Sequence, residues 1–461
     1  MIGRMLERLF RIREHGSSVR VEVLGGVTTF VTMAYIIVVN PAILSAAGIP
    51  AGPSTVATIL VAVLGTLLMG LYANRPIGVA PYMGENAFIA FGLGAMGIGW
   101  QQCLGAVFVS GLAFVVITLL GVRRWLAASI SPSLKYSFAV GIGLFLALVG
   151  LYESGIVTSS VTGTPPAPLL AAGTGLLTAP AVPLKIGDLH DTRVLLAVLG
   201  FLVTVGLMQR RVRGALLLGI GLTAALGFVF GVGEAPQGIV ALPFTGQYSL
   251  APLALQLDVV GVLQISFLPV LLTLFLMGFL DTLGTLVGVG AAGELLDERG
   301  DFPQIERPML VDAVTCTAAG LIGTTTSGAY NETATGIREG ARTGLAAVTT
   351  ALLFATSLFF VPLVEPLQRL HYSYAPALVV VGLLMIGAVR KIDFEDLTEL
   401  VPAFATIVMM VFTYNIANGL TAGLLLHPLA KLMAGRWREI SGGSLLLAFA
   451  CAAYYLFGLP H

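Results

Sequence analysis

Charged residues are scarce in this chain of 461 residues: only 10% are Asp, Glu, Lys or Arg, whereas soluble domains carry about 25%. So few charges cannot cover the water-exposed surface of a globular protein of this length. Because 57% of the residues are hydrophobic, lipid must cover most of the outside. The sequence therefore predicts an integral membrane protein.

The chain also lacks the patterns of disulfide frameworks, metal sites and nucleic-acid binding. Cys103, Cys316 and Cys451 stand alone in apolar stretches, so they predict neither a disulfide nor a metal site. The formal net charge is zero, which argues against a nucleic-acid partner. The five histidines are scattered and form no pair with a nucleophile, so we expect no catalytic residues, no metal, no cofactor and no enzyme activity.

What the sequence has in quantity is apolar runs, and we count fourteen between residues 21 and 433. Two of them, 84–96 and 329–338, are too short to cross a membrane. Each follows an extended stretch rich in Gly, Pro and Thr, 78–82 and 324–328. We interpret both as broken spans, numbers 3 and 10, which are extended in one half and helical in the other.

The basic residues indicate the orientation of these spans. With a cytoplasmic N-terminus and fourteen crossings, 21 of the 24 Lys and Arg residues fall in inside loops. Only Lys185, Arg193 and Arg369 fall outside. We therefore expect a multi-pass protein of the cell membrane with its N-terminus in the cytoplasm.

The two broken spans also indicate an internal repeat. They are centred near Asn86 and Glu332, 246 residues apart. Because each repeat would hold seven spans, an odd number, the second must be inverted relative to the first. Paired interrupted helices in an inverted repeat point to a transport site, since unwound backbone is tolerated at mid-membrane only where it lines a cavity. The predicted fold class is an all-α polytopic membrane protein with fourteen transmembrane segments in a seven-plus-seven inverted repeat.

Three acids stand at membrane depth, where ionisable residues are costly and are therefore candidates for function. Glu85 lies at the first break, Asp281 midway along the eighth span and Glu332 at the second break. One interpretation is structural: a carboxylate caps a half-helix, which suits Glu85 and Glu332 better than Asp281. The other is that these acids accept hydrogen bonds from a substrate or carry a coupled proton, because burial disfavours the charged form.

Several motifs resemble those of a known family. They are Gly26–Pro41, Met83–Phe88, Asp281–Gly288, Gly336–Gly344 and Phe412–Gly419. In order and spacing, from about residue 20 to 435, they are similar to the AzgA-like branch of the nucleobase permeases. Proteins of that branch are adenine, guanine and hypoxanthine proton symporters. The resemblance implies a substrate-holding core domain of spans 1–4 and 8–11, a gate domain of spans 5–7 and 12–14, and a homodimer.

The resemblance also implies site residues. Asp281 and Glu332 match the acids of spans 8 and 10 that contact the purine, and Asn86 matches an asparagine beside the site. Two residues depart from the branch, because Glu85 stands where an apolar residue is usual and Asn331 where an aliphatic one is usual. Both departures add polarity and bear on which base is preferred. The expected substrate site comprises Asp281, Glu332, Asn86, Glu85, Asn331, Phe88 and Thr29, with Asp281 and Glu332 as the proton-coupling residues.

We therefore expect a secondary active transporter that imports adenine, guanine, hypoxanthine or xanthine by proton symport, with an elevator-like movement of the core. Sodium stays open as the coupling ion, because unwound carbonyls and carboxylates can bind it. One alternative is a transporter of another nucleobase or urate. A second is an anion transporter of the sulfate-permease type, against which the acids Asp281 and Glu332 argue.

These expectations divide the chain into segments. They are a cytoplasmic N-terminal segment 1–20, core and start of gate over 21–152 and 263–363, an extracellular loop 153–192, gate spans over 193–262 and 373–433, and a C-terminal apolar segment 434–461. The last segment holds an apolar run too short to count as a span.

Overall fold

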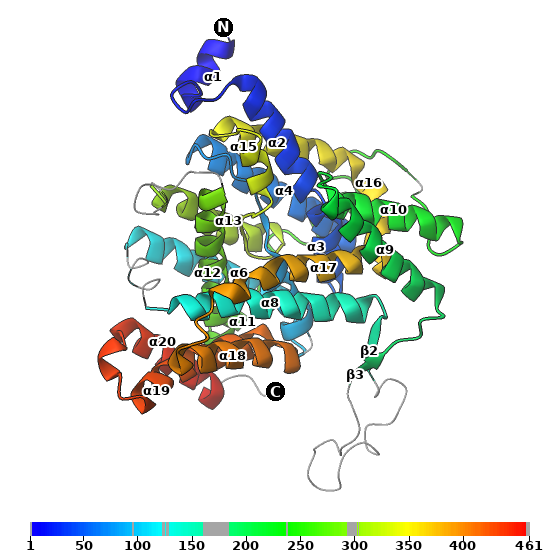
Figure 1. Cartoon of the computed structure of the whole chain (residues 1–461). Coiled ribbons are helices and arrows are strands. Elements are labelled where there is room, and N and C mark those ends of the chain that lie inside the picture. The colour runs from blue at the N-terminus through cyan, green and yellow to red at the C-terminus, as the bar shows by residue number, and fades with distance from the viewer. Residues whose placement is uncertain are drawn as a thin grey trace.

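The structure is a computed structural model that describes residues 2–94, 96–121, 125, 129–159, 184–236, 238–292, 302 and 304–457. It is predominantly helical (Figure 1). The longer helices are α1 (Ile2–Phe10), α2 (Val19–Met33), α3 (Ile36–Ser45), α4 (Ala51–Leu71), α6 (Trp100–Leu119), α8 (Pro132–Glu153), α9 (Thr192–Gln209), α10 (Ala215–Val229), α12 (Leu268–Ala292), α13 (Glu306–Ile322), α15 (Gly344–Ser357), α17 (His371–Met385), α18 (Leu397–Phe412), α19 (Ile416–Met433) and α20 (Gly442–Phe457).

Short elements join or interrupt these helices. The strands are β1 (Val79–Pro81), β2 (Val157–Ser159), β3 (Leu184–Ile186) and β4 (Ser327–Ala329). The short helices are α5 (Met83–Ala87), η1 (Phe88–Leu93), η3 (Gly246–Tyr248), α11 (Val259–Val262), η4 (Ile265–Phe267), α14 (Thr333–Arg338), η5 (Leu358–Phe360), α16 (Val361–Val364), η6 (Glu365–Arg369), η7 (Ile386–Lys391) and η8 (Trp437–Glu439).

Within the described residues, eight helical segments are long and apolar enough to cross a membrane. They are Val19–Ser45, Ala51–Leu71, Trp100–Leu119, Pro132–Glu153, Thr192–Gln209, Val270–Gly290, Gly344–Arg369 and His371–Lys391. Shorter apolar helices accompany them, at Ala215–Val229, Leu397–Phe412 and Gly442–Ala452. The prediction of a helical membrane protein is confirmed, while the count of fourteen crossings stays a prediction.

The helices pack in two groups. In the first group α15 packs against α2 and α4, and α13 packs against α4 and α6. In the second group α8 lies between α17 and α18, α18 pairs with α19, and α9 packs against α10 and α17. Figure 1 shows α8 and α17 running side by side across the molecule, with α18 and α19 next to them. Each group therefore combines helices from both halves of the sequence.

Both predicted extended stretches are confirmed, and they pair with each other. β1 and β4 run antiparallel in the register Val79↔Ala329, Ala80↔Gly328 and Pro81↔Ser327. The backbone bonds continue beyond the strands, since Tyr82 donates its N–H to the Thr326 carbonyl at 2.9 Å. This pairing satisfies backbone groups that an interrupted helix would leave unpaired inside a membrane. β4 begins 248 residues after β1, close to the predicted offset of 246.

The predicted extracellular loop 153–192 is only partly described. Its two ends pair as the antiparallel strands β2 and β3, with Val157 opposite Ile186. The middle of the predicted loop, residues 160–183, lies outside the described residues.

Helices α4 and α15 approach until their backbones touch. A Cβ atom added to Gly344 would lie 2.0 Å from the carbonyl oxygen of Gly70, and one added to Gly70 would lie 2.7 Å from the carbonyl oxygen of Gly344. The Gly344 N–H also donates to the side-chain oxygen of Asn74 at 2.8 Å. Small residues allow this close packing of membrane helices, for which burial from water supplies little drive.

Gly344→Ala is therefore expected to destabilise the folded protein by about 1–3 kcal/mol, the usual cost of overpacking. Thermal melting of the detergent-purified protein measures this as a lower melting temperature. Gly221→Ala in α10 is the matched control, because a Cβ atom there meets nothing within 4 Å. Equal melting temperatures for the two variants would contradict the close approach.

Candidate functional site

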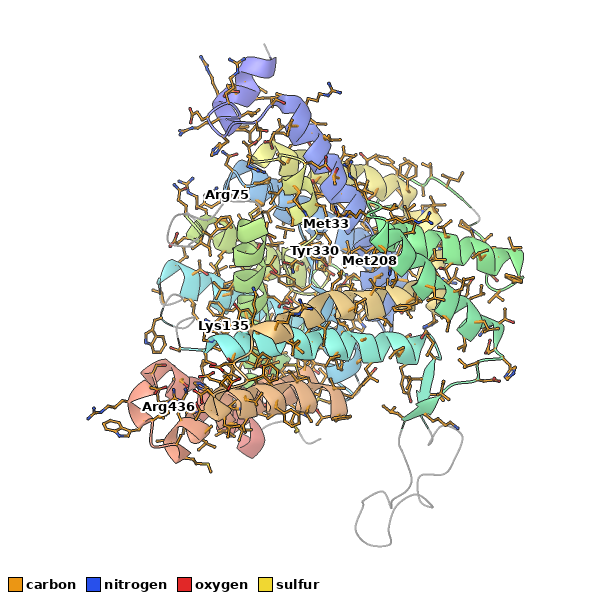
Figure 2. All side chains as sticks on the ribbon, in the orientation of Figure 1. Met33, Arg75, Lys135, Met208, Tyr330 and Arg436 are labelled. Carbon is orange, nitrogen blue, oxygen red and sulfur yellow. The ribbon has the colours of Figure 1, made fainter. Side chains whose placement is uncertain are left out.

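A cavity of about 2250 Å³ lies between the two helix groups. Its walls come from α2 and α12 on one side and from α8 and α17 on the other, and the two broken spans close its inner end. Tyr330, which directly follows β4, lies in the interior of the bundle, whereas Arg75 and Arg436 lie near its periphery (Figure 2). The cavity therefore brings together the two interruptions that the sequence predicts.

Glu332, which follows the second extended stretch, contacts residues at the junction of α2 and α3. The buried Tyr35 donates its hydroxyl to one carboxylate oxygen of Glu332 at 2.7 Å. The hydroxyl of Thr32 also approaches the backbone carbonyl of Glu332, at 3.5 Å. Glu332, Tyr35 and Thr32 all line the cavity.

Asp281 and Glu85 bring two carboxyl groups together on the opposite side of the breaks. Asp281 belongs to α12 and lines the cavity, while Glu85 belongs to α5 and is fully buried behind it. Helix α5 packs against α12, which places the two carboxyl groups close enough to interact. Neither oxygen of Glu85 receives a hydrogen bond from the described part of the chain.

Two tyrosines form a parallel pair beside these acids. Tyr82 follows β1 and Tyr330 follows β4, and their ring planes differ by 6° with centroids 6.5 Å apart. The hydroxyl of Tyr82 lies 3.0 Å from that of Thr282, and the hydroxyl of Tyr330 donates to the Pro81 carbonyl. Directly stacked rings have centroids about 4.5–7 Å apart, so this pair lies at the wide end of the range.

Gly328 makes room for this arrangement. It lies opposite Ala80 in the centre of the strand pair, and a Cβ atom there would lie 2.1 Å from the Tyr82 hydroxyl oxygen. The tyrosine pair was missed by the sequence analysis. The only local signal is that each tyrosine directly follows one of the two extended stretches.

The structure separates the predicted site residues into two sets. Asp281, Glu332 and Asn331 line the cavity, whereas Glu85, Asn86, Phe88 and Thr29 do not. From α2 it is Thr28 and Thr32 that reach the cavity, because Thr29 packs against the backbone of Gly78 and Gly336.

Asn86 and Phe88 serve the packing around the first break. Asn86 donates its amide to the side-chain oxygen of Asn40 at 2.8 Å. Asn40 in turn donates to Thr58 at 2.7 Å and to Thr324 at 3.1 Å. Phe88 is buried, and its ring packs over Gly92 of the same broken span. These residues hold the break in place from behind the cavity.

A cavity lined by two strand–helix breaks and by carboxyl groups, inside a bundle of apolar helices, defines a membrane transporter. The sequence matches the Permease family over residues 20–421, so the chain belongs to this family. The prediction of a transporter and not an enzyme is thereby confirmed. The motif resemblance stated above is confirmed as well.

Similar proteins extend over nearly the whole chain. A putative permease of Methanocaldococcus jannaschii is 41% identical, over 99% of this chain and 100% of the relative. The adenine permease AdeQ of Escherichia coli is 37% identical, over 95% of this chain and 93% of the relative. The guanine/hypoxanthine permease PbuO of Bacillus subtilis is 36% identical, over 96% and 98% respectively.

Solved structures share the fold at low sequence identity. The transmembrane domain of the cyanobacterial bicarbonate transporter BicA matches with a TM-score of 0.62 and 16% identity, over 88% of this chain and 97% of that domain. The SLC26A9 structure matches with a TM-score of 0.58 and 10% identity, over 94% and 69% respectively. At such identities these matches describe the fold alone.

Proposed function

We propose that this protein is a secondary active transporter that imports purine nucleobases by proton symport. The observation that carries the proposal is the meeting of Asp281 and Glu332 with the tyrosine pair Tyr82 and Tyr330 at the inner end of one cavity. The names of the adenine and guanine/hypoxanthine permeases among the relatives support the same substrate class.

The chemistry of the site suits a flat heterocycle with N–H groups on its edge. Carboxylates are strong acceptors for such donors, and Asp281 and Glu332 approach the cavity from different elements. A planar ring between two parallel tyrosines needs about 3.5 Å to each, or roughly 7 Å in all. The observed centroid separation of 6.5 Å falls short of this, so we place the purine against the cavity side of the tyrosine pair and not between the two rings. Asn331 at the cavity edge is a further candidate contact for base preference.

The same acids are the proposed proton carriers. The neutral Tyr35 donates a hydrogen bond to the Glu332 carboxylate, and Asp281 adjoins another acid. A carboxyl group in such surroundings exchanges protons more readily than one neutralised by Lys or Arg. Proton and purine would then bind together from one side of the membrane and leave together on the other.

The proposed movement is an elevator-like displacement of a core against a gate. The first helix group corresponds to predicted spans 1–4 and 8–11, and the second to spans 5–7 and 12–14. The antiparallel pairing of β1 with β4 is what an inverted seven-plus-seven repeat requires of equivalent segments. The homodimer and the cell-membrane location of the resembling branch remain part of this proposal.

The cavity in this structure reaches basic residues that the sequence analysis assigns to the cytoplasmic side. They are Lys135, Arg211, Arg213, Arg338 and Lys391. We therefore assign the structure to the inward-facing conformation, from which substrate leaves the protein. An anion transporter of the fold represented by BicA is the second candidate, but two carboxyl groups in the cavity would repel its substrate.

Thermal melting of the purified protein with a panel of nucleobases tests the proposal, because a ligand that binds only the folded state raises the melting temperature. We expect a shift with adenine, guanine, hypoxanthine or xanthine. A shift with urate or a pyrimidine alone would reassign the base to another class. A shift with sulfate or bicarbonate and with no base would replace the proposal by anion transport.

A further inference from the structure

Glu85 is a buried acid that the proposed purine contacts do not use. It lies in the first turn of α5, is fully buried, and does not line the cavity. Both of its carboxylate oxygens are without a hydrogen-bond donor in the described residues. A buried ionised carboxylate in this state is energetically costly, so its partner has to be sought among the neighbouring groups.

The neighbours of Glu85 are acidic or neutral. The groups that interact with it electrostatically are Asp281 on α12, Tyr330 after β4 and Cys316 on α13. Of the other elements packed against α5, α3 and η1 contain no titratable residue. Helix α8 carries titratable residues only at its ends, and none of them acts on Glu85: Lys135, Tyr136, Tyr152 and Glu153. No cation among the described residues therefore balances Glu85.

The proximity of Glu85 to Asp281, with no cation beside Glu85 among the described residues, limits the charge that the two carboxyl groups can carry. Two ionised carboxylates are both acceptors, so neither can donate to the other, and at close range in a low dielectric they repel strongly. One proton between them removes the repulsion and supplies the missing donor. Tyr330 and Cys316 do not supply this donor, because the Tyr330 hydroxyl donates to the Pro81 carbonyl and the Cys316 thiol donates to the Ser327 carbonyl.

We propose that Glu85 and Asp281 share one proton, and that this pair is the store for the proton that is coupled to purine movement. The proposal rests on the proposed function and deepens it. In the resting pair the Glu85 hydroxyl donates to one Asp281 oxygen, which leaves the other oxygen of Asp281 for a purine N–H. Because Asp281 lines the cavity and Glu85 does not, the proton of Glu85 reaches the cavity by way of Asp281. The transfer breaks the O–H bond of one carboxyl group and forms that of the other, with no further reactant.

A purely structural role is the competing interpretation: Glu85 would stay protonated throughout and only hold Asp281 in place. The two interpretations differ for Glu85→Gln, because glutamine keeps a donor toward Asp281 and has no proton to exchange.

The experiment uses the full-length protein in liposomes, with Glu85→Gln, Glu85→Asp and Glu85→Leu compared with the original chain. Glu234→Gln is the matched control, because Glu234 is exposed and lies outside the cavity. Adenine or guanine uptake is recorded as a function of pH, and the proton-to-purine ratio is taken from the reversal potential. An infrared difference spectrum between high and low pH, recorded without purine, reports the carbonyl band of a buried protonated carboxyl group.

We expect Glu85→Gln and Glu85→Leu to lose that infrared band, to flatten the pH profile of uptake and to move fewer protons for each purine. Glu85→Asp is expected to keep the band and the pH dependence, and so is Glu234→Gln. If Glu85→Gln keeps the band, the pH profile and the proton-to-purine ratio of the original chain, the proposal of a shared proton is wrong and Glu85 has a structural role. A sodium gradient that drives uptake with no dependence on pH would also overturn it.

Failure of the proposed function gives a different result. If the original chain shows no melting shift with any base, purine transport is wrong, and the infrared comparison of the same variants still decides whether the pair holds a proton. If Glu85→Gln and Glu85→Leu do not fold, the decision comes from Glu85→Asp and the original chain. Absence of the protonated carboxyl band from both would then overturn the proposal.

Discussion

Asp281→Asn is expected to lower purine uptake by more than about 100-fold while the protein still inserts and folds. A hydrogen bond to a charged group is worth about 1.5–3 kcal/mol, or roughly 10- to 150-fold in binding. The amide also turns an acceptor into a mixed donor and acceptor, so part of it would oppose a purine N–H. Loss of the titratable group also removes proton exchange. Purine accumulation should therefore fall by a larger factor than the loss of binding affinity alone would cause.

Uptake of labelled adenine or guanine in cells without their own purine permeases measures this loss. Uptake by Glu332→Gln is expected to fall to a similar level, although its amide oxygen can still accept from Tyr35, because glutamine lacks the negative charge that strengthens a hydrogen bond from a purine N–H. Glu234→Gln, an exposed acid, is the control for removing one carboxylate. Normal accumulation by Asp281→Asn or Glu332→Gln, at equal expression and equal melting temperature, would remove these residues from the site.

The second large effect is expected at the tyrosine pair. Tyr82→Leu and Tyr330→Leu should each weaken purine binding by about 5- to 150-fold, because stacking of a base on an aromatic ring is worth about 1–3 kcal/mol. Tyr82→Phe keeps the ring and loses the hydroxyl contacts to Thr282 and Asp312, and Tyr330→Phe keeps the ring and loses the contact to Pro81. The affinity of these two variants for purine should therefore lie within a few-fold of that of the original protein.

Isothermal titration of the purified variants with adenine or guanine separates these cases. The informative quantity is the ratio of the dissociation constants of the leucine and phenylalanine variants at the same position. Both changes remove the hydroxyl group, so this ratio reports the loss of the aromatic ring alone. If the leucine variants bind purine as well as the phenylalanine variants at both positions, the purine does not stack on these rings. The two tyrosines would then have only the structural role of closing the inner end of the cavity.

The sequence located the breaks well because the cause is local. Gly78 and Pro81 before the first short run, and Thr324–Gly328 before the second, disfavour helix in any surroundings. β1 lies within the first stretch, and β4 overlaps the end of the second and extends one residue beyond it. Asp281 and Glu332 were recognisable for a similar reason, since an acid inside an apolar run needs no knowledge of its neighbours to be unusual. The motif resemblance added the substrate class, and Permease family membership agrees with it.

Other residues could not be placed in this way. Thr28, Thr29 and Thr32 lie on one helix, and only the packing of α2 against α14 and α15 decides that Thr29 faces backbone while the other two face the cavity. Asn86 matches a site motif, yet its side chain turns to Asn40 because a buried amide there finds a partner. In both cases the orientation depends on a contact that the local sequence does not contain.

The sequence by itself determined that this is an integral membrane protein, that two of its apolar runs are interrupted by extended stretches, and that acids lie within apolar runs. These properties follow from composition, run length and turn-forming residues, each of which acts over a few neighbouring positions. Only the tertiary structure decided that β1 pairs with β4, that Tyr82 lies parallel to Tyr330, and that Glu85 adjoins Asp281. Those contacts join residues about 200 to 250 positions apart, and they exist because helix packing brings the two breaks to one point in the bundle.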